Sequence, residues 1–223
     1  MPLVDDIGHV LAPPHPAGRP FILGGLVAVM LGLALGPWLA WLGVLFALLC
    51  LFFFRDPERV PPGRAGAVIA PADGRVVSVM PAVPPSELGL GQMPRWRVST
   101  FLSVLNVYVN RVPADGIITR IAYRHGSFLN ASTDKASEAN ERNAIALRLP
   151  DGREIAVVQI AGLIARRIVC DLREGDTVQA GQRLGIIRFG SRADLYLPEG
   201  VRPLIAVGQT MIGGETVIAE LAP

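Results

Sequence analysis

Lysine and histidine are scarce in this chain of 223 residues. Only one of the 21 basic residues is a lysine, Lys135, and the three histidines are His9, His15 and His125. An enzyme that forms a Schiff base through a lysine, including one that uses pyridoxal phosphate, therefore has a single candidate residue. The three histidines have no metal-ligand spacing. We expect neither pyridoxal phosphate nor a metal ion as cofactor.

Cysteine is also rare, and the arginines are dispersed. Cys50 lies in an apolar stretch and Cys170 in a predicted strand, so we interpret both as small buried hydrophobic residues rather than as a disulfide or a metal site. The net charge of +2 excludes little. Because arginine is spread along the chain and no nucleic-acid motif is present, we expect no nucleic-acid partner.

Charge is absent from residues 21–54. One continuous helix over this stretch would be about 51 Å long, well beyond a bilayer core of about 30 Å. We therefore expect Gly36-Pro37 to divide it into two short helices. Arg19 precedes the stretch and Arg55 follows it, so the positive-inside rule predicts that both ends face the cytoplasm. These features predict an inner-membrane protein whose main domain is cytoplasmic.

Composition divides the chain into four parts. Residues 1–20 are rich in proline and predict a loosely ordered surface segment with solvated histidines. Residues 21–54 form the hydrophobic hairpin, residues 55–66 a proline-containing linker, and residues 67–223 the main domain. Two alternatives to a membrane-spanning hairpin stay open, which are insertion into one leaflet and a soluble protein with a buried helical hairpin.

Short runs of alternating hydrophobicity dominate the main domain. They predict strands at 67–70, 74–80, 96–102, 106–111, 116–122, 144–149 and 154–161. Turn pairs such as Asp73-Gly74 punctuate these runs, and loops are expected at 81–94 and 130–143. The expected fold is mainly β (α+β), an antiparallel β-sandwich or hybrid-motif-like domain preceded by a hydrophobic helical hairpin.

One Gly-Ser pair, Gly190-Ser191, stands between the apolar runs 184–189 and 193–197, which predict two strands meeting at a tight turn. If the turn is strained, the Ser191 hydroxyl can attack the Gly190 carbonyl. The resulting ester can eliminate and hydrolyse to leave a pyruvoyl group at residue 191. Most Gly-Ser pairs are ordinary turns, and Gly126-Ser127 is a second candidate for such a cut.

The surroundings of Gly190-Ser191 add specificity. Phe189-Gly190-Ser191-Arg192, together with 53–57, 70–74, 134–143 and 167–170, resembles the short bacterial (type A) phosphatidylserine decarboxylases over nearly the whole chain. The resemblance implies a pyruvoyl-dependent carboxy-lyase, made as a proenzyme, that converts phosphatidylserine in the membrane to phosphatidylethanolamine. It also implies self-cleavage into a β chain, 1–190, and an α chain, 191–223, which stay together as a non-covalent heterodimer. Further oligomerisation is left open.

The resemblance also implies an aspartate, histidine and serine triad. Asp73 matches the aspartate, Gly190 is the cleavage site, and Ser191 becomes the pyruvoyl group that forms a Schiff base with the substrate. The family places a histidine where this chain has Tyr108, and a neutral tyrosine is a poor base at pH 7 because its reference pKa is near 10. His125, the only histidine of the main domain, is therefore our candidate for the imidazole.

The substrate carboxylate and phosphate need cationic partners, and arginine suits both. Arg111, Arg188 and Arg192 are the candidates. Two other functions stay open. Paired Asp-Gly and Gly-Asp turns at 72–77 and 174–185 resemble biotinyl and lipoyl carrier domains, which would make the protein a membrane-tethered carrier or binding module. The second alternative is a pyruvoyl decarboxylase that acts on another amino-acid headgroup.

Overall fold

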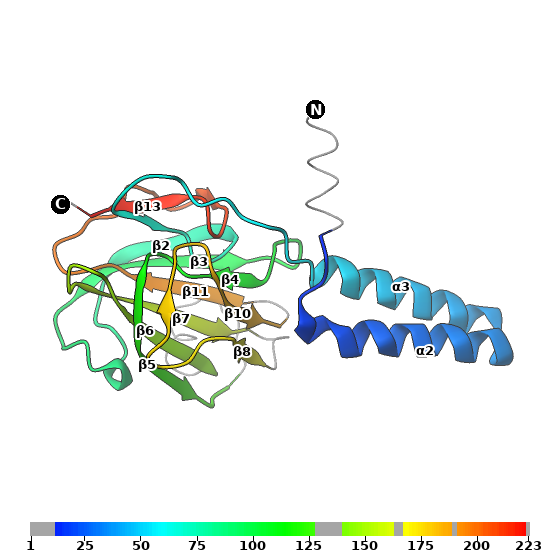
Figure 1. Ribbon diagram of the computed structural model, residues 1–223. Coiled ribbons are helices and arrows are strands. Elements are labelled where there is room, and N and C mark those ends of the chain that lie inside the picture. The colour runs from blue at the N-terminus through cyan, green and yellow to red at the C-terminus, as the bar shows by residue number, and fades with distance from the viewer. Residues whose placement is uncertain (1–11, 128–139, 163–166, 189–190, 222–223) are drawn as a thin grey trace. The chain divides into compact units, whose positions relative to one another are not determined.

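The computed structural model describes residues 12–127, 140–162, 167–188 and 191–221 (Figure 1). The chain divides into two units. The first runs to Glu58 and includes residues 107–109, and the second comprises residues 59–106 and the chain from Asn110 onward.

The first unit is a helical hairpin. A 3₁₀ turn, η1 (Pro16–Gly18), leads into α2 (Arg19–Leu35), and Gly36 separates α2 from α3 (Pro37–Phe53). The expected division at Gly36-Pro37 is confirmed. Proline at the first position of α3 can begin that helix but cannot continue the preceding one, because it lacks the backbone N–H that the ladder needs.

The two helices of the hairpin pack closely. A Cβ at Gly32 would lie 2.1 Å from the backbone nitrogen of Ala40, so only glycine permits this approach. Large apolar side chains face outward and are exposed, among them Leu23, Met30, Leu33, Trp38, Trp41 and Leu45. Among the described residues, Pro16–Leu35 is the one helix long and apolar enough to cross a membrane, which is compatible with membrane association.

His15 is buried, with 5% of its surface exposed. Its Nδ1 accepts a hydrogen bond of 3.2 Å from the Ala17 backbone nitrogen at the start of η1. The expectation of a solvated His15 is wrong, because the imidazole caps an unsatisfied donor of the first turn. His9 lies outside the described residues.

The second unit is built on an eight-stranded antiparallel sheet, which confirms the expected β fold (Figure 1). The strand order is β12-β2-β3-β11-β7-β6-β5-β9. The strands are β2 (Gly74–Ala82), β3 (Arg95–Leu102), β5 (Gly116–Arg124), β6 (Arg142–Arg148), β7 (Glu154–Ala161), β9 (Thr177–Val178), β11 (Ser191–Tyr196) and β12 (Thr210–Met211). The strand expected at 154–161 coincides with β7.

The described residues also form two smaller sheets and a 3₁₀ turn. They contain β1 (Ala67–Ile69) with β13 (Val217–Glu220), then β4 (Val109–Arg111), β10 (Arg183–Ile187) and β8 (Ile168–Cys170) in the order β4-β10-β8, and η2 (Ser86–Leu88) within the segment expected to be a loop. The runs on either side of Gly190-Ser191 therefore form strands of different sheets, β10 and β11. The chain changes sheet at this point.

Strand alternation divides the side chains of β11 between two faces. Leu195 packs in the main core cluster with Val98 and Val157, and we call this face the inner face. Tyr196 belongs to a second cluster on the outer face, which includes Leu88 of η2 and Val158. Ser191 and Ala193 share the inner face with Leu195, whereas Arg192 and Asp194 share the outer face with Tyr196.

Candidate active site

Ser191 is the first residue of the strand at the centre of the large sheet. It pairs with Leu102 of β3 on one side and with Ala161 of β7 on the other. Its side chain is fully buried, and its Oγ has no hydrogen-bond partner among the described residues. Gly190 lies outside the described residues. A buried hydroxyl without a partner is costly, which makes this position a candidate reaction centre.

Three buried amide side chains form a hydrogen-bonded row, and the middle one, Gln159, lies on the inner face. Asn143 Nδ2 donates to Gln159 Oε1 at 2.9 Å, and Gln159 Nε2 donates to Asn110 Oδ1 at 2.8 Å. Gln159 lies directly opposite Ala193, two residues along the strand from Ser191. Asn110 Nδ2 is buried and has no partner among the described residues. The row thus ends in a donor with an open position, the kind of group that can stabilise a developing oxyanion.

Asp73 lies at the same end of the sheet as Ser191. Arg75, Phe101 and Arg192 pair in one row across β2, β3 and β11, and Asp73 precedes Arg75 by two residues. It is therefore two strands from Ser191, or about 10 Å at the usual strand spacing. Its Oδ1 accepts a hydrogen bond of 2.7 Å from the Gly213 nitrogen.

Arg59 is the second partner of Asp73. Arg59 Nη2 lies 3.1 Å from Asp73 Oδ1 and 2.9 Å from Oδ2. Only 8% of the Arg59 side chain and 15% of the Asp73 side chain are exposed. The contact is a charge-assisted hydrogen bond of the strong kind. The aspartate of the expected triad is thus held by a guanidinium in this structure.

His125 follows β5 in the row of Ser191 but three strands away, or about 14 Å. The pairing of Arg124 with Arg142 and of Arg142 with Ile160 sets this register. The imidazole is 89% exposed, and its Nδ1 lies 3.7 Å from Glu141 Oε2. The hydroxyl of Tyr123 donates to the same carboxylate. Burial and the Glu141 charge raise the pKa of Tyr123 to about 12.

Tyr108 belongs to the first unit. It is fully buried, and its ring centroid lies 4.3 Å from that of Phe53 at an interplanar angle of 36°. Burial beside an aromatic ring favours the neutral phenol over a phenolate. The side chain at this position is therefore a packed ring with one polar end.

The three candidate arginines have different surroundings. Arg192 lies on the outer face and binds Asp194 through two contacts, of 2.6 and 3.0 Å, with both side chains 1% exposed. Arg111 is buried, and its backbone nitrogen donates to the Pro71 carbonyl near Asp73. Arg188 directly follows β10, and burial and then the charge of Arg167 lower its pKa.

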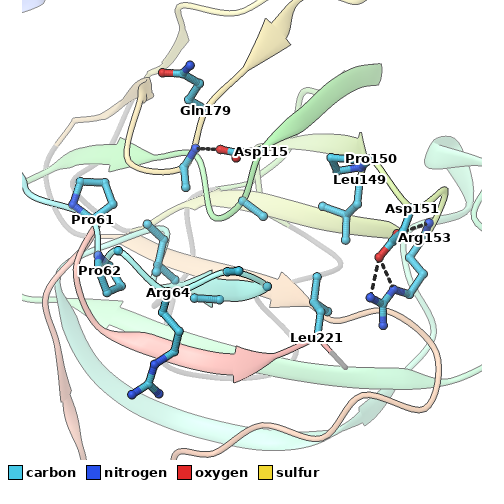
Figure 2. Close-up of a pocket in the computed structure, with 17 residues that line it drawn as sticks. Pro61, Pro62, Arg64, Asp115, Leu149, Pro150, Asp151, Arg153, Gln179 and Leu221 are labelled. Carbon is cyan, nitrogen blue, oxygen red and sulfur yellow. Dashed lines mark hydrogen bonds and ion pairs between the residues drawn. The ribbon is translucent and has the colours of Figure 1, made fainter. Parts of the chain in front are cut away.

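A groove of about 880 Å³ lies at the other end of the large sheet (Figure 2). Leu149 and Asp151, in the turn between β6 and β7, line it together with linker residues 61–66. The length of β7 separates it from the row of Ser191, about 24 Å at the usual rise per residue. Its charged groups are engaged locally, since Arg153 binds Asp151 and Asp115 accepts a hydrogen bond from the Ala180 nitrogen. Of the candidate catalytic residues that the structure describes, none lines this groove.

A family model of phosphatidylserine decarboxylases matches residues 46–219 of the chain. The chain belongs to the phosphatidylserine decarboxylase family. The recognition from the motifs around Gly190-Ser191 is thus confirmed.

Three bacterial relatives described as phosphatidylserine decarboxylase proenzymes match over almost their full length. The protein of Granulibacter bethesdensis is 71% identical, with 100% of this chain and 91% of the relative covered. The proteins of Gluconacetobacter diazotrophicus and Gluconobacter oxydans are 63% and 60% identical, each with 99% of this chain and 100% of the relative covered. The name proenzyme, as given to these relatives, fits a chain that is processed.

Sequence reasoning missed two features of this candidate site. The first is the amide row of Asn110, Gln159 and Asn143, although a glutamine between Val158 and Ile160 in an apolar strand is an available signal of a buried polar contact. The second is Arg59, which lies in a linker with several arginines of similar appearance. Only the folded register distinguishes it from its neighbours.

The amide row makes a stability prediction. Replacing Gln159 by methionine removes both hydrogen bonds and leaves Asn110 and Asn143 buried with fewer partners, so the free energy of unfolding should fall by about 1–3 kcal/mol for each amide. Denaturant unfolding of the full-length protein in detergent measures this, with Ser191→Ala present in every sample so that processing does not contribute.

The matched control is Gln182→Met. Gln182 is an exposed glutamine whose Oε1 accepts one hydrogen bond from the Gln179 nitrogen. Its replacement should change stability by about 0.5 kcal/mol or less. Equal stabilities for the two variants would contradict a structural role for the row.

Proposed function

We propose that this protein is a phosphatidylserine decarboxylase that cuts itself between Gly190 and Ser191 and carries a pyruvoyl group at residue 191. The observation that supports this most is the fully buried Ser191 hydroxyl, which has no hydrogen-bond partner among the described residues. Unsatisfied polar groups concentrate at functional positions, because folding alone would select against them. Family membership over nearly the whole chain supports the same function.

Self-cleavage takes place at the Gly190–Ser191 peptide bond and on the Ser191 side chain. The Ser191 oxygen attacks the Gly190 carbonyl carbon, and the acyl group moves from nitrogen to oxygen. Loss of the Ser191 α-proton then breaks the carbon–oxygen bond, which releases residues 1–190 with a carboxylate end. Water next displaces the amino nitrogen as ammonia, and a ketone remains at residue 191. Groups that remove protons and stabilise the oxyanion speed these steps.

Asp73, His125 and Tyr108 are the proposed participants besides Ser191. A carboxylate such as Asp73 can orient a neighbouring imidazole and stabilise its charged form. His125 remains the proposed base, because it is the only histidine of residues 67–223. Its exposed position about three strands from Ser191 means that the end of β5 must rearrange for this role. Tyr108 is the competing candidate, as a proton donor.

A pyruvoyl group supplies a ketone that binds the substrate amine and takes up the electron pair left when carbon dioxide departs. The inner face suits such a group, because two small residues, Ala161 and Ala193, adjoin Ser191. We propose that Arg188 and Arg111 bind the substrate carboxylate and phosphate. Two neighbouring cations, such as Arg188 and Arg167, favour an anion between them. For Arg192 to bind substrate, its ion pair with Asp194 would have to open.

The two chains should stay together after the cut as a non-covalent heterodimer. β11 pairs with β3 and β7, β12 pairs with β2, and β13 pairs with β1. Each strand described in residues 191–221 is therefore hydrogen-bonded to a strand that precedes the cut. Separating the chains would break four strand pairings and expose their backbone groups and the core beneath them.

We also propose that the protein acts at the inner membrane with its catalytic part on the cytoplasmic side, as a β chain of residues 1–190 and an α chain of residues 191–223. The apolar helix Pro16–Leu35 supports attachment to lipid, and Arg19 and Arg55 at the ends of the apolar stretch support the orientation. A lipid substrate stays in the bilayer, so an anchored enzyme meets its headgroup at the surface.

The full-length protein should convert phosphatidylserine in mixed micelles to phosphatidylethanolamine, and Ser191→Ala should lose this activity completely. Ser127→Ala, which changes the other Gly-Ser pair, should keep wild-type activity. Chromatography of the lipid products measures the reaction. Hydroxylamine, which reacts with ketones, should inactivate the wild type.

A folded wild-type protein that releases no phosphatidylethanolamine would contradict the proposal. Turnover of a different amino-acid headgroup in the same assay, without turnover of phosphatidylserine, would favour the alternative decarboxylase. A carrier or binding module would turn over neither lipid. Lys135, the residue that a carrier would need for modification, lies outside the described residues.

The roles of His125 and Tyr108 can be separated by two substitutions. His125→Ala should slow self-cleavage by about 10²-fold or more, since general bases typically contribute that factor, whereas Tyr108→Phe should cleave at close to the wild-type rate. A time course of chain cleavage on gels after cell-free synthesis measures both. If His125→Ala cleaves normally and Tyr108→Phe does not, the two roles must be exchanged.

A further inference from the structure

Arg59 connects the linker to the candidate catalytic aspartate. It is the first residue of the second unit and lies within residues 55–66, the linker that follows the helical hairpin. Its Nη2 is within hydrogen-bond distance of both carboxylate oxygens of Asp73. At 8% exposure it is far more buried than Arg64 of the same linker, which is 63% exposed.

The surroundings of Asp73 fix this contact in place. The Gly213 nitrogen donates to Asp73 Oδ1, so the carboxylate has backbone and guanidinium partners together. Glu215 accepts a hydrogen bond of 3.4 Å from the Val60 nitrogen and lies 3.9 Å from Arg59 Nη1. The carboxylates of Asp73 and Glu215 therefore hold the linker at two consecutive residues, Arg59 and Val60.

Arg111 lies beside this cluster. A Cβ at Gly214, where φ is +85°, would come within 3.1 Å of Arg59 Cβ and 3.3 Å of Arg111 Cγ. The stems of both arginines thus pack against the same glycine, which has no side chain to separate them. The charged groups around Asp73 in the described residues include Arg59, Arg111 and Glu215. A carboxylate in such surroundings is favoured in its ionised form.

We propose that Arg59 is a positioning residue for Asp73, which it holds ionised and in one orientation for the self-cleavage at Ser191. The inference rests on the proposed function above. It follows that cleavage requires a docked linker, because the contact to Asp73 comes from the linker itself. A chain whose linker is displaced from Glu215 and Asp73 should stay a proenzyme.

Arg59 variants of the full-length protein test this through the rate of self-cleavage as a function of pH. The chains are made by cell-free synthesis with detergent, and cleavage is followed on gels from the end of synthesis. Arg59→Met should slow cleavage at neutral pH by about tenfold or more, since each lost contact to a charged group typically costs that factor. The acid side of its pH profile should move to higher pH, because loss of the neighbouring cation makes Asp73 easier to protonate.

Arg59→Lys is the conservative variant. Lysine keeps the charge but not the fixed fork of donors. It should therefore cleave at a rate between those of the wild type and Arg59→Met, with the pH profile of the wild type. If Arg59→Met does not fold, Arg59→Lys alone tests the proposal. A cleavage rate of Arg59→Lys equal to that of the wild type then overturns it.

Arg64→Met is the matched control. It removes another ion pair of the linker, the exposed pair of Arg64 with Glu220. Its cleavage rate should stay within about twofold of the wild type, because exposed ion pairs contribute little.

The outcomes separate this inference from the proposed function. If the wild type and Arg64→Met cleave and Arg59→Met cleaves with the same rate and pH profile, Arg59 does not position Asp73, and the proposed function stands. If Arg59→Met is slow at every pH with an unshifted profile, the linker contact is only structural, and the proposal fails. A folded wild type that does not cleave contradicts the proposed function itself.

Discussion

The pairing of β11 on both of its edges is the constraint on which the rest of the site depends. Hydrogen bonds to β3 and β7 fix the register of six consecutive residues. Because side chains alternate along a strand, a slip of one residue would exchange Ser191 with Arg192 between the two faces. The ion pair of Arg192 with Asp194, buried on the outer face, opposes such a slip, since either charge alone would be costly there.

This register also explains how distant parts of the chain come to the same end of the sheet. Asp73, Ser191 and His125 come from segments far apart in sequence, and the sheet brings them to the same end. The middle amide of the row, Gln159, lies opposite Ala193 on the inner face, two residues along β11 from Ser191. Polar groups that face a core are normally paired, and the Asn110 Nδ2 donor at one end of this row has no partner among the described residues.

Much of the fold can be predicted from local signals. The division of the apolar stretch at Gly36-Pro37 follows from the geometry of proline, and β7 follows from an alternating run bounded by turns. The candidate serine follows from a Gly-Ser pair in a specific context. Each of these features depends on a few neighbouring residues, so a local sequence pattern can predict it.

The remaining features depend on contacts between distant residues. The contact of Arg59 with Asp73 joins a linker to a turn, and nothing near Arg59 in sequence distinguishes it from Arg64. The opposite faces of Ser191 and Arg192 follow from alternation, but which face is the core side depends on the sheet as a whole. His15 likewise contacts a distant part of the chain, since its backbone nitrogen donates to the Phe54 carbonyl.

The site places its proposed reaction at one peptide bond, so the mass of the purified protein tests the account most directly. Intact-mass spectrometry of the wild type should give two chains that meet at Gly190 and Ser191, the second with 33 residues (223 − 190) and a blocked N-terminus that gains mass with hydroxylamine. A single chain of 23.8 kDa from folded wild-type protein would contradict the account. A C-terminal chain of 97 residues (223 − 126) would move the reaction to Ser127.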